Sequence, residues 1–100
     1  MDEKPASEAA KVPNWTFLSN HTHVLVCLAR NPEIVLRDVA VLVGLTERAV
    51  QRIVSELEHG GYIAREKEGR RNRYSLTLAK SLRHPVEMNC NLQSLINLIK

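Results

Sequence analysis

Basic side chains gather in one short stretch near residue 70 and are the first candidates for chemistry. The stretch reads REKEGRRNRYSL, residues 65–76, and surrounds a single glycine, Gly69. Residues 61–85 carry seven basic and two acidic side chains, whereas the other segments are close to neutral. A local positive excess on a near-neutral chain indicates a surface that binds a polyanion. The alternative is a hairpin whose charge only keeps it solvated.

Two short helices joined by a tight turn are expected directly before this stretch. Residues 36–43 and 50–57 each place apolar side chains at i, i+3, i+4 and i+7, which is one face of a helix. Gly44 can adopt the left-handed conformation that ends a helix, and Thr46 can cap the next one. The pattern predicts a helix-turn-helix, although a plain helical hairpin of another domain has the same pattern.

The residues after the second helix favour the helix-turn-helix. Residues 63–66 are predicted to form a strand, Glu68-Gly69-Arg70 a turn, and residues 73–78 a second strand with alternating polarity. A helix-turn-helix followed by a β-hairpin is a winged helix-turn-helix. The predicted fold is therefore mainly α with a small β-hairpin: a three-helix core, a wing and a short C-terminal helix.

The ends of the chain complete the predicted architecture. Residues 1–13 are rich in small, charged and proline residues, which predicts a disordered N-terminal tail before a single domain over residues 14–100. A first helix is expected to begin at Ser19 or Asn20 and to end at Asn31-Pro32. Asn91 is expected to cap the last helix.

The segment LTERAVQRIVSELEHGGYIAREKEGRRNRYSL resembles the helix-and-wing segment of winged helix-turn-helix transcriptional regulators of the ArsR and MarR type. The resemblance covers residues 15–78. It implies operator binding by a homodimer, with the recognition helix, residues 46–60, in the major groove and the basic wing, residues 67–73, on the backbone or minor groove. The cysteine pair of ArsR metal sensors is missing, and the short chain predicts little room for a MarR-type ligand pocket. The effector is therefore not carried over and stays unknown.

Candidate DNA contacts lie opposite the apolar stripe of the second helix. Arg48 and Gln51 are three residues apart, so both can reach one groove, where arginine pairs with guanine and glutamine with adenine. Arg52 either contacts a base or pairs with Glu56. The predicted contacts are Thr46, Arg48, Gln51, Arg52 and Ser55 on the helix, and Lys67, Arg70, Arg71, Asn72 and Arg73 on the wing.

The last helix carries an apolar stripe that must be covered. Leu92, Leu95, Ile96 and Ile99 share one face, and so short a helix does not persist alone in water. With Trp15 and Phe17 near the first helix, this stripe predicts a dimer interface. The alternative is that the helix folds back on the core of its own chain.

Other functions find little support in the sequence. No phosphate loop, GxSxG or HExxH motif is present, so no enzymatic activity is predicted. His84 and Cys90 offer too few ligands for a structural metal site, so no metal or cofactor is predicted. The absence of a signal sequence and of a membrane span predicts a cytoplasmic protein. The resemblance implies that its partner is double-stranded DNA. Two alternatives remain: a winged helix used for protein–protein contact, and a thiol- or metal-responsive sensor on the same fold.

Overall fold

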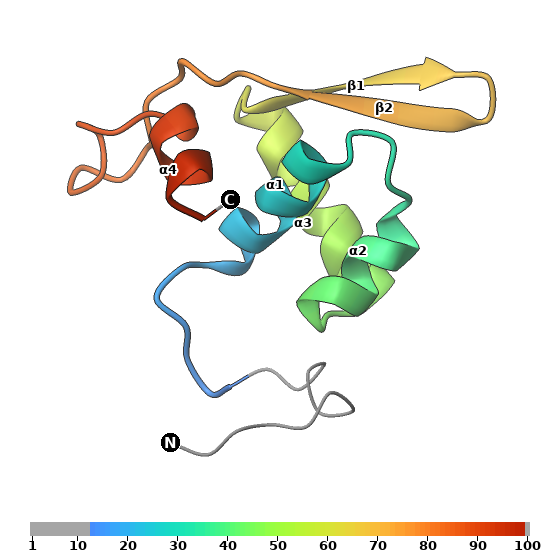
Figure 1. Cartoon of the computed structure of the whole chain (residues 1–100), viewed down its shortest axis with the longest axis horizontal. Helices are drawn as coiled ribbons and strands as arrows, with labels where there is room; N and C mark the ends of the chain where they lie inside the picture. The colour runs from blue at the N-terminus through green and yellow to red at the C-terminus, as the bar shows by residue number, and fades with distance from the viewer. Residues whose placement is uncertain (1–12, 100) are drawn as a thin grey trace.

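The fold comprises helices around a central α1, with a β-hairpin at one end. The structure is a computed structural model that describes residues 13–99, so the predicted tail lies outside the described residues except for Pro13. The elements in chain order are α1 (Asn20–Arg30), α2 (Leu36–Val43), α3 (Glu47–His59), β1 (Ile63–Glu68), β2 (Arg71–Leu76) and α4 (Leu92–Ile99). Figure 1 shows the hairpin projecting from one end and α4 at the other. The predicted winged helix-turn-helix is confirmed.

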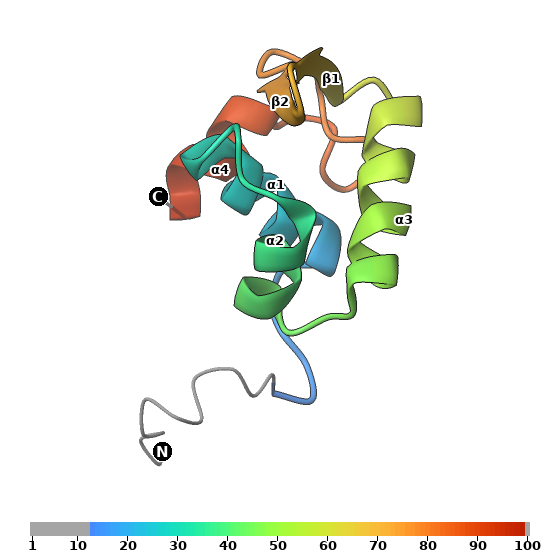
Figure 2. The ribbon, with the colours of Figure 1, turned by 90° about the vertical axis from the view of Figure 1, so that its right-hand side faces the viewer.

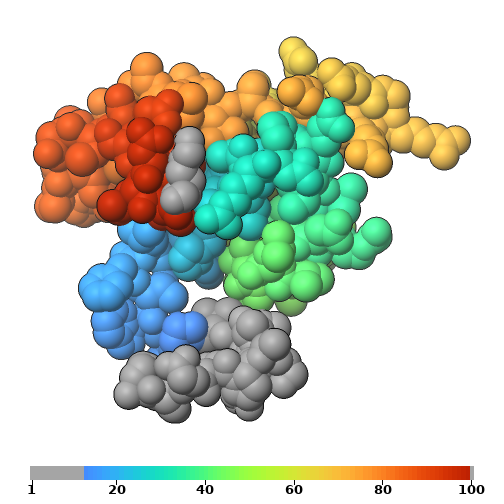
Figure 3. Space-filling view, viewed as in Figure 1, coloured from blue at the N-terminus to red at the C-terminus, as the bar shows by residue number. Residues whose placement is uncertain are grey.

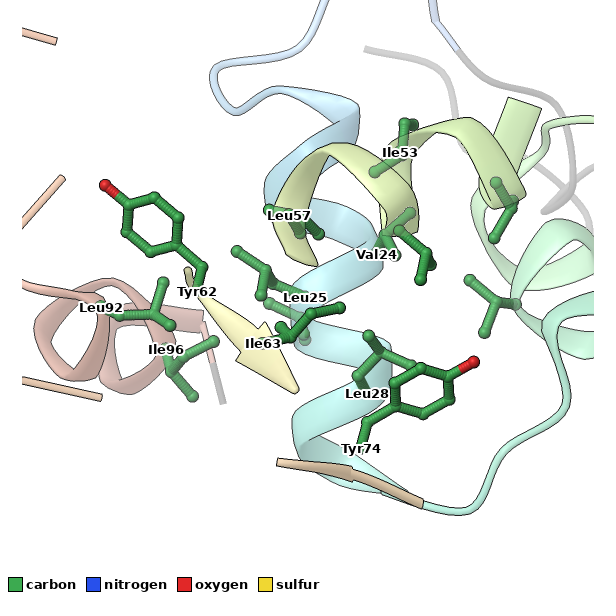
Figure 4. Close-up of a cluster of buried hydrophobic side chains, with 14 of the residues drawn as sticks. Val24, Leu25, Leu28, Ile53, Leu57, Tyr62, Ile63, Tyr74, Leu92 and Ile96 are labelled. Atoms are coloured by element: carbon green, nitrogen blue, oxygen red, sulfur yellow. The ribbon is translucent and has the colours of Figure 1, made fainter. Parts of the chain in front are cut away.

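Helix α1 forms the centre of the core. The Ser19 hydroxyl caps it by accepting a hydrogen bond from the Thr22 backbone N–H, and Asn31 follows its last residue, as predicted. Val24 and Leu28 are fully buried. The helix contacts α2, α3, α4 and β2, and Figure 4 shows side chains from these elements meeting along it. Helix α1 therefore contacts every other helix and strand β2, whereas β1 is held by β2 and α3.

The turn between α2 and α3 has the conformation that the sequence predicts. Gly44 has φ of 84°, in the left-handed region that favours glycine, and its N–H donates to the carbonyl of Ala40. The Thr46 hydroxyl accepts a hydrogen bond of 3.1 Å from the N–H of Ala49 and begins α3. Buried Val39 and Val50 fill the space between the helices.

The hairpin differs from the prediction in both strands. Strand β1 continues to Glu68, a predicted turn residue, rather than ending at residue 66. Strand β2 begins at Arg71 rather than at residue 73, because the register pairs Glu68 with Arg71 around a two-residue turn. Gly69 has φ of 63°, as the first central residue of a type II′ turn requires. The N–H of Thr77 still donates to the carbonyl of Tyr62, its next partner in register, but the N–H of Tyr62 donates to the carbonyl of Leu57, and the ladder therefore ends at Leu76.

Helix α4 docks on its own chain, which corrects part of the predicted dimer interface. Asn91 caps the helix as expected, since its Oδ1 accepts from the N–H of Ser94 at 2.9 Å. Leu92 is 0 % exposed and Ile96 is 5 % exposed, and both pack in the core beside α1. Leu95 and Ile99 are half-buried against the same core. The stripe therefore completes the core of the chain, and Leu92 and Ile96 are covered by their own chain.

Candidate nucleic-acid interface

The outer side of α3 carries the side chains predicted to read DNA. Thr46, Arg48, Gln51 and Arg52 are exposed, and Ser55 is half-buried. The opposite side buries Val50, Ile53, Val54 and Leu57 in the core. Figure 2 shows α3 along one edge of the molecule, with its outer side turned away from α1 and α2. A rod-like partner can therefore approach this side without displacing any part of the core.

A groove runs between α3, the hairpin and the segment that precedes α2. Gln51 and Ser55 line it from the helix, Glu33 lines it from the segment before α2, and Arg65, Arg70, Arg71 and Asn72 line it from the hairpin. Figure 2 looks along the hairpin from its tip and shows α3 beside it. The groove thus brings donors from the predicted recognition helix and the predicted wing to one place.

The two faces of the hairpin carry different charge. Residues paired in register point to the same face, and neighbours along a strand point to opposite faces. Arg65 pairs with Tyr74 and Lys67 with Asn72, so these four share the face on which Tyr74 is buried; we call this the inner face. The outer face carries Glu66 opposite Arg73 and Glu68 opposite Arg71. The inner face is basic, whereas acidic and basic side chains alternate on the outer face.

This alternation divides the predicted wing residues into separate groups. Lys67 and Asn72 lie on the inner face, Arg71 and Arg73 on the outer face, and Arg70 in the turn. The alternation predicted for residues 73–78 already sets Arg73 on the face opposite Tyr74, and the register agrees. The predicted strands stop at residue 66 and begin at residue 73, so the prediction assigns no face to Lys67, Arg71 and Asn72.

Three arginines of the hairpin form ion pairs with acidic side chains. Arg73 Nη1 lies 2.8 Å from Glu33 Oε2, and Arg71 Nη1 lies 3.8 Å from Glu33 Oε1. Arg65 donates two hydrogen bonds to Glu58, of 2.7 and 3.2 Å, and these bonds raise the pKa of Arg65 further. Among residues 13–99, Lys67 and Arg70 are the wing cations without such an ion pair.

Two residues of this region escaped the sequence-based prediction. Arg65 belongs to the basic stretch, yet its place on the inner face became evident only from the register. Glu33 is distant from the wing in sequence and contacts it only because the carbonyl of Pro32 accepts a 2.9 Å hydrogen bond from the N–H of Tyr74 in β2. This bond holds the segment before α2 against the hairpin.

Comparison with known proteins bears directly on this arrangement. Residues 19–64 match the winged helix-turn-helix DNA-binding family model. The match runs from the cap of α1 into β1, so it contains the whole helix-turn-helix and supports a DNA-binding regulator. It does not distinguish the ArsR type from the MarR type. No significant match was found among curated proteins or among solved structures.

The histidine and cysteine side chains of this winged helix-turn-helix do not assemble into a metal centre within residues 13–99, where no three potential ligands cluster. His84 Nδ1 accepts a 3.1 Å hydrogen bond from the N–H of Val86, which is a local structural role. Cys90 is exposed and Cys27 is half-buried. In the described part of the chain, no helix is long and apolar enough to cross a membrane.

Proposed function

We propose that this protein is a non-catalytic transcriptional regulator that binds specific double-stranded DNA as a homodimer in the cytoplasm. One observation carries the proposal: the outer side of α3 and the basic inner face of the hairpin meet at a single groove. A cylinder that contacts the helix therefore also meets the cations of the wing. The match of residues 19–64 to winged helix-turn-helix DNA-binding domains supports the same partner.

In this mechanism α3 enters the major groove and supplies the sequence readout. Its N-terminus carries unpaired backbone N–H groups and a partial positive charge, both of which suit a phosphate beside Thr46. Arg48 and Gln51 reach the base edges, where each can form a bidentate pair. Arg52, which has no ion-pair partner among the described residues, adds a further base or phosphate contact.

The wing supplies contacts to the backbone or to the minor groove. Lys67 lies on the inner face and Arg70 at the tip, and neither forms an ion pair within residues 13–99. Both can therefore bind phosphates without first breaking an ion pair. Arg71 and Arg73 contribute after they leave Glu33. These contacts add affinity that depends on salt and hardly on sequence.

Binding of duplex DNA measured against salt concentration tests the proposal. Arg70→Ala and Lys67→Ala should each weaken binding to every duplex and lower the salt slope by about 0.9 for each phosphate that is no longer neutralised. Lys80→Ala is the matched control, since it removes one positive charge from a side chain packed over the Tyr62 ring. Wild-type protein that binds neither random nor selected duplex would favour a protein–protein module instead.

A further inference from the structure

A hollow of about 690 Å³ lies at the end of the molecule away from the wing tip. The expectation of little room for a pocket is therefore wrong. The apolar part of its wall comes from four distant segments of the chain, which is why no local pattern indicated it. Besides Phe17 and Leu18, these side chains are Leu25, Leu57, Tyr62, Leu82, Leu92 and Leu95.

Beside this hollow the chain exposes a pair of aromatic rings. Trp15 is 69 % exposed and Phe17 is 92 % exposed, and their ring centres lie 5.1 Å apart in an edge-to-face arrangement. Phe17 also lines the hollow. Val86 and Met88 are exposed on the segment between β2 and α4. Large apolar side chains gathered outside the core mark a surface that another molecule covers.

Charged side chains of both signs line the hollow. Arg83 and Glu87 line it, and within residues 13–99 neither forms an ion pair. His21 Nε2 lies 2.7 Å from Glu56 Oε1 at the same hollow, and this hydrogen bond lowers the pKa of Glu56. One surface therefore presents an apolar projection together with an apolar hollow, and a cation together with an anion.

We propose that two copies of the chain pair through this surface about a two-fold axis, with the Trp15–Phe17 pair of each copy inserted in the hollow of the other. A two-fold contact requires one patch that is complementary to itself, and these paired features meet that requirement. A small ligand in the hollow would leave the aromatic pair, Val86 and Met88 exposed, so a second copy accounts for more of the surface.

The pairing supplies an interface for the homodimer proposed above, but it does not rest on DNA binding. Figure 3 shows the wing tip at one end of the molecule and the segment between β2 and α4, which lines the hollow, at the other, so the hollow and the wing can be occupied at once. Pairing can therefore be measured without DNA. A protein that pairs but binds no duplex would contradict the proposed function and leave this inference intact.

Trp15 provides a direct signal, because it is the only tryptophan of the chain. As protein concentration rises, sedimentation should change from one chain to two, and the tryptophan emission should move to shorter wavelength over the same range. Phe17→Ser should keep the protein monomeric with an unchanged circular dichroism spectrum, since the side chain is outside the core. Val41→Ser, which alters an exposed apolar residue on α2, is the control and should leave pairing intact.

Mixing two impaired variants tests the reciprocal contact. Leu82→Trp should fill the hollow but leave the projection, whereas Phe17→Ser removes the projection and one rim residue of its own hollow but leaves the wall formed by Leu25, Leu57 and Leu82. Each should be monomeric alone, and their mixture should form dimers that contain one copy of each. A wild type that stays monomeric up to its solubility limit would overturn the proposal, as would Phe17→Ser pairing like wild type. If Leu82→Trp does not fold, the oligomeric state of Phe17→Ser alone tests the proposal.

Discussion

The guanidinium of Arg73 and the carboxylate of Glu33 form an ion pair of 2.8 Å across 40 positions of the sequence. The same carboxylate lies 3.8 Å from Nη1 of Arg71, so one acidic residue faces two wing arginines. In the proposed complex both arginines are candidates for phosphate contacts. Glu33 therefore competes with DNA for them.

Removal of this competitor should strengthen binding to all duplexes. We expect Glu33→Gln to raise affinity and to steepen the salt dependence by up to about 0.9 for each arginine released. The free energy of unfolding should change by less than about 1 kcal/mol, because exposed ion pairs contribute little. Fluorescence anisotropy against salt measures the first effect. Asp38→Asn is the control, because it removes one negative charge from the first turn of α2. If both variants gain the same affinity, the gain comes from the change in net charge and not from release of the wing arginines.

Arg48 should determine base preference. Arg48→Ala should cost about 1–3 kcal/mol at one position of the preferred site and relax selection there, because the bidentate pair with a base edge can no longer form. Selection from random duplexes, repeated with the variant, measures this change. The side chain is exposed, so the unfolding transition should be unaffected. A loss of equal size on every sequence would instead make Arg48 a phosphate contact.

Removal of each tyrosine hydroxyl should have a different effect on the free energy of unfolding. The Tyr74 hydroxyl is buried without a hydrogen-bond partner among the described residues, whereas the Tyr62 hydroxyl donates to the Ser81 carbonyl at 2.7 Å. Tyr62→Phe should lower the free energy of unfolding by about 0.5–1.5 kcal/mol, and Tyr74→Phe should leave it unchanged or raise it. Urea unfolding of the pair provides the comparison. Equal losses would mean that the Tyr74 hydroxyl forms a hydrogen bond in solution.

The two cysteines should differ in reactivity. Burial raises the pKa of the Cys27 thiol, with nearby Arg30 opposing the shift, so less of the reactive thiolate is present at a given pH. Cys90 is exposed. At about pH 8, iodoacetamide should modify Cys90 first and Cys27 only slowly, as peptide mass spectrometry can show. Comparable rates would indicate that α1 opens locally.

The helices were predictable because each boundary depends on a short local signal. Ser19, Gly44, Thr46 and Asn91 cap or end helices through contacts only a few residues long, and all four act as the sequence predicts. The exposed side of α3 followed from the same periodicity. These features need no knowledge of distant parts of the chain.

The remaining features depend on how distant segments meet. The pairing of Glu68 with Arg71 extends both strands beyond their predicted ends, and it thereby assigns Lys67, Arg71 and Asn72 to faces of the hairpin. The burial of Leu92 against α1 required α4 to return to its own chain, one of two alternatives that periodicity left open. The contact of Glu33 with the wing is likewise a product of tertiary structure.

The two unlike faces of the hairpin make its length as important as its composition. Strand residues alternate between faces, so a one-residue insertion in β1 between Ile63 and Arg65 would turn every side chain beyond it to the other face. Arg65 and Lys67 would then leave the inner face, although no charge had been gained or lost. Insertions or deletions in the strands of such wings should therefore involve an even number of residues, which keeps each side chain on its face. A count of basic residues would not reveal this rule.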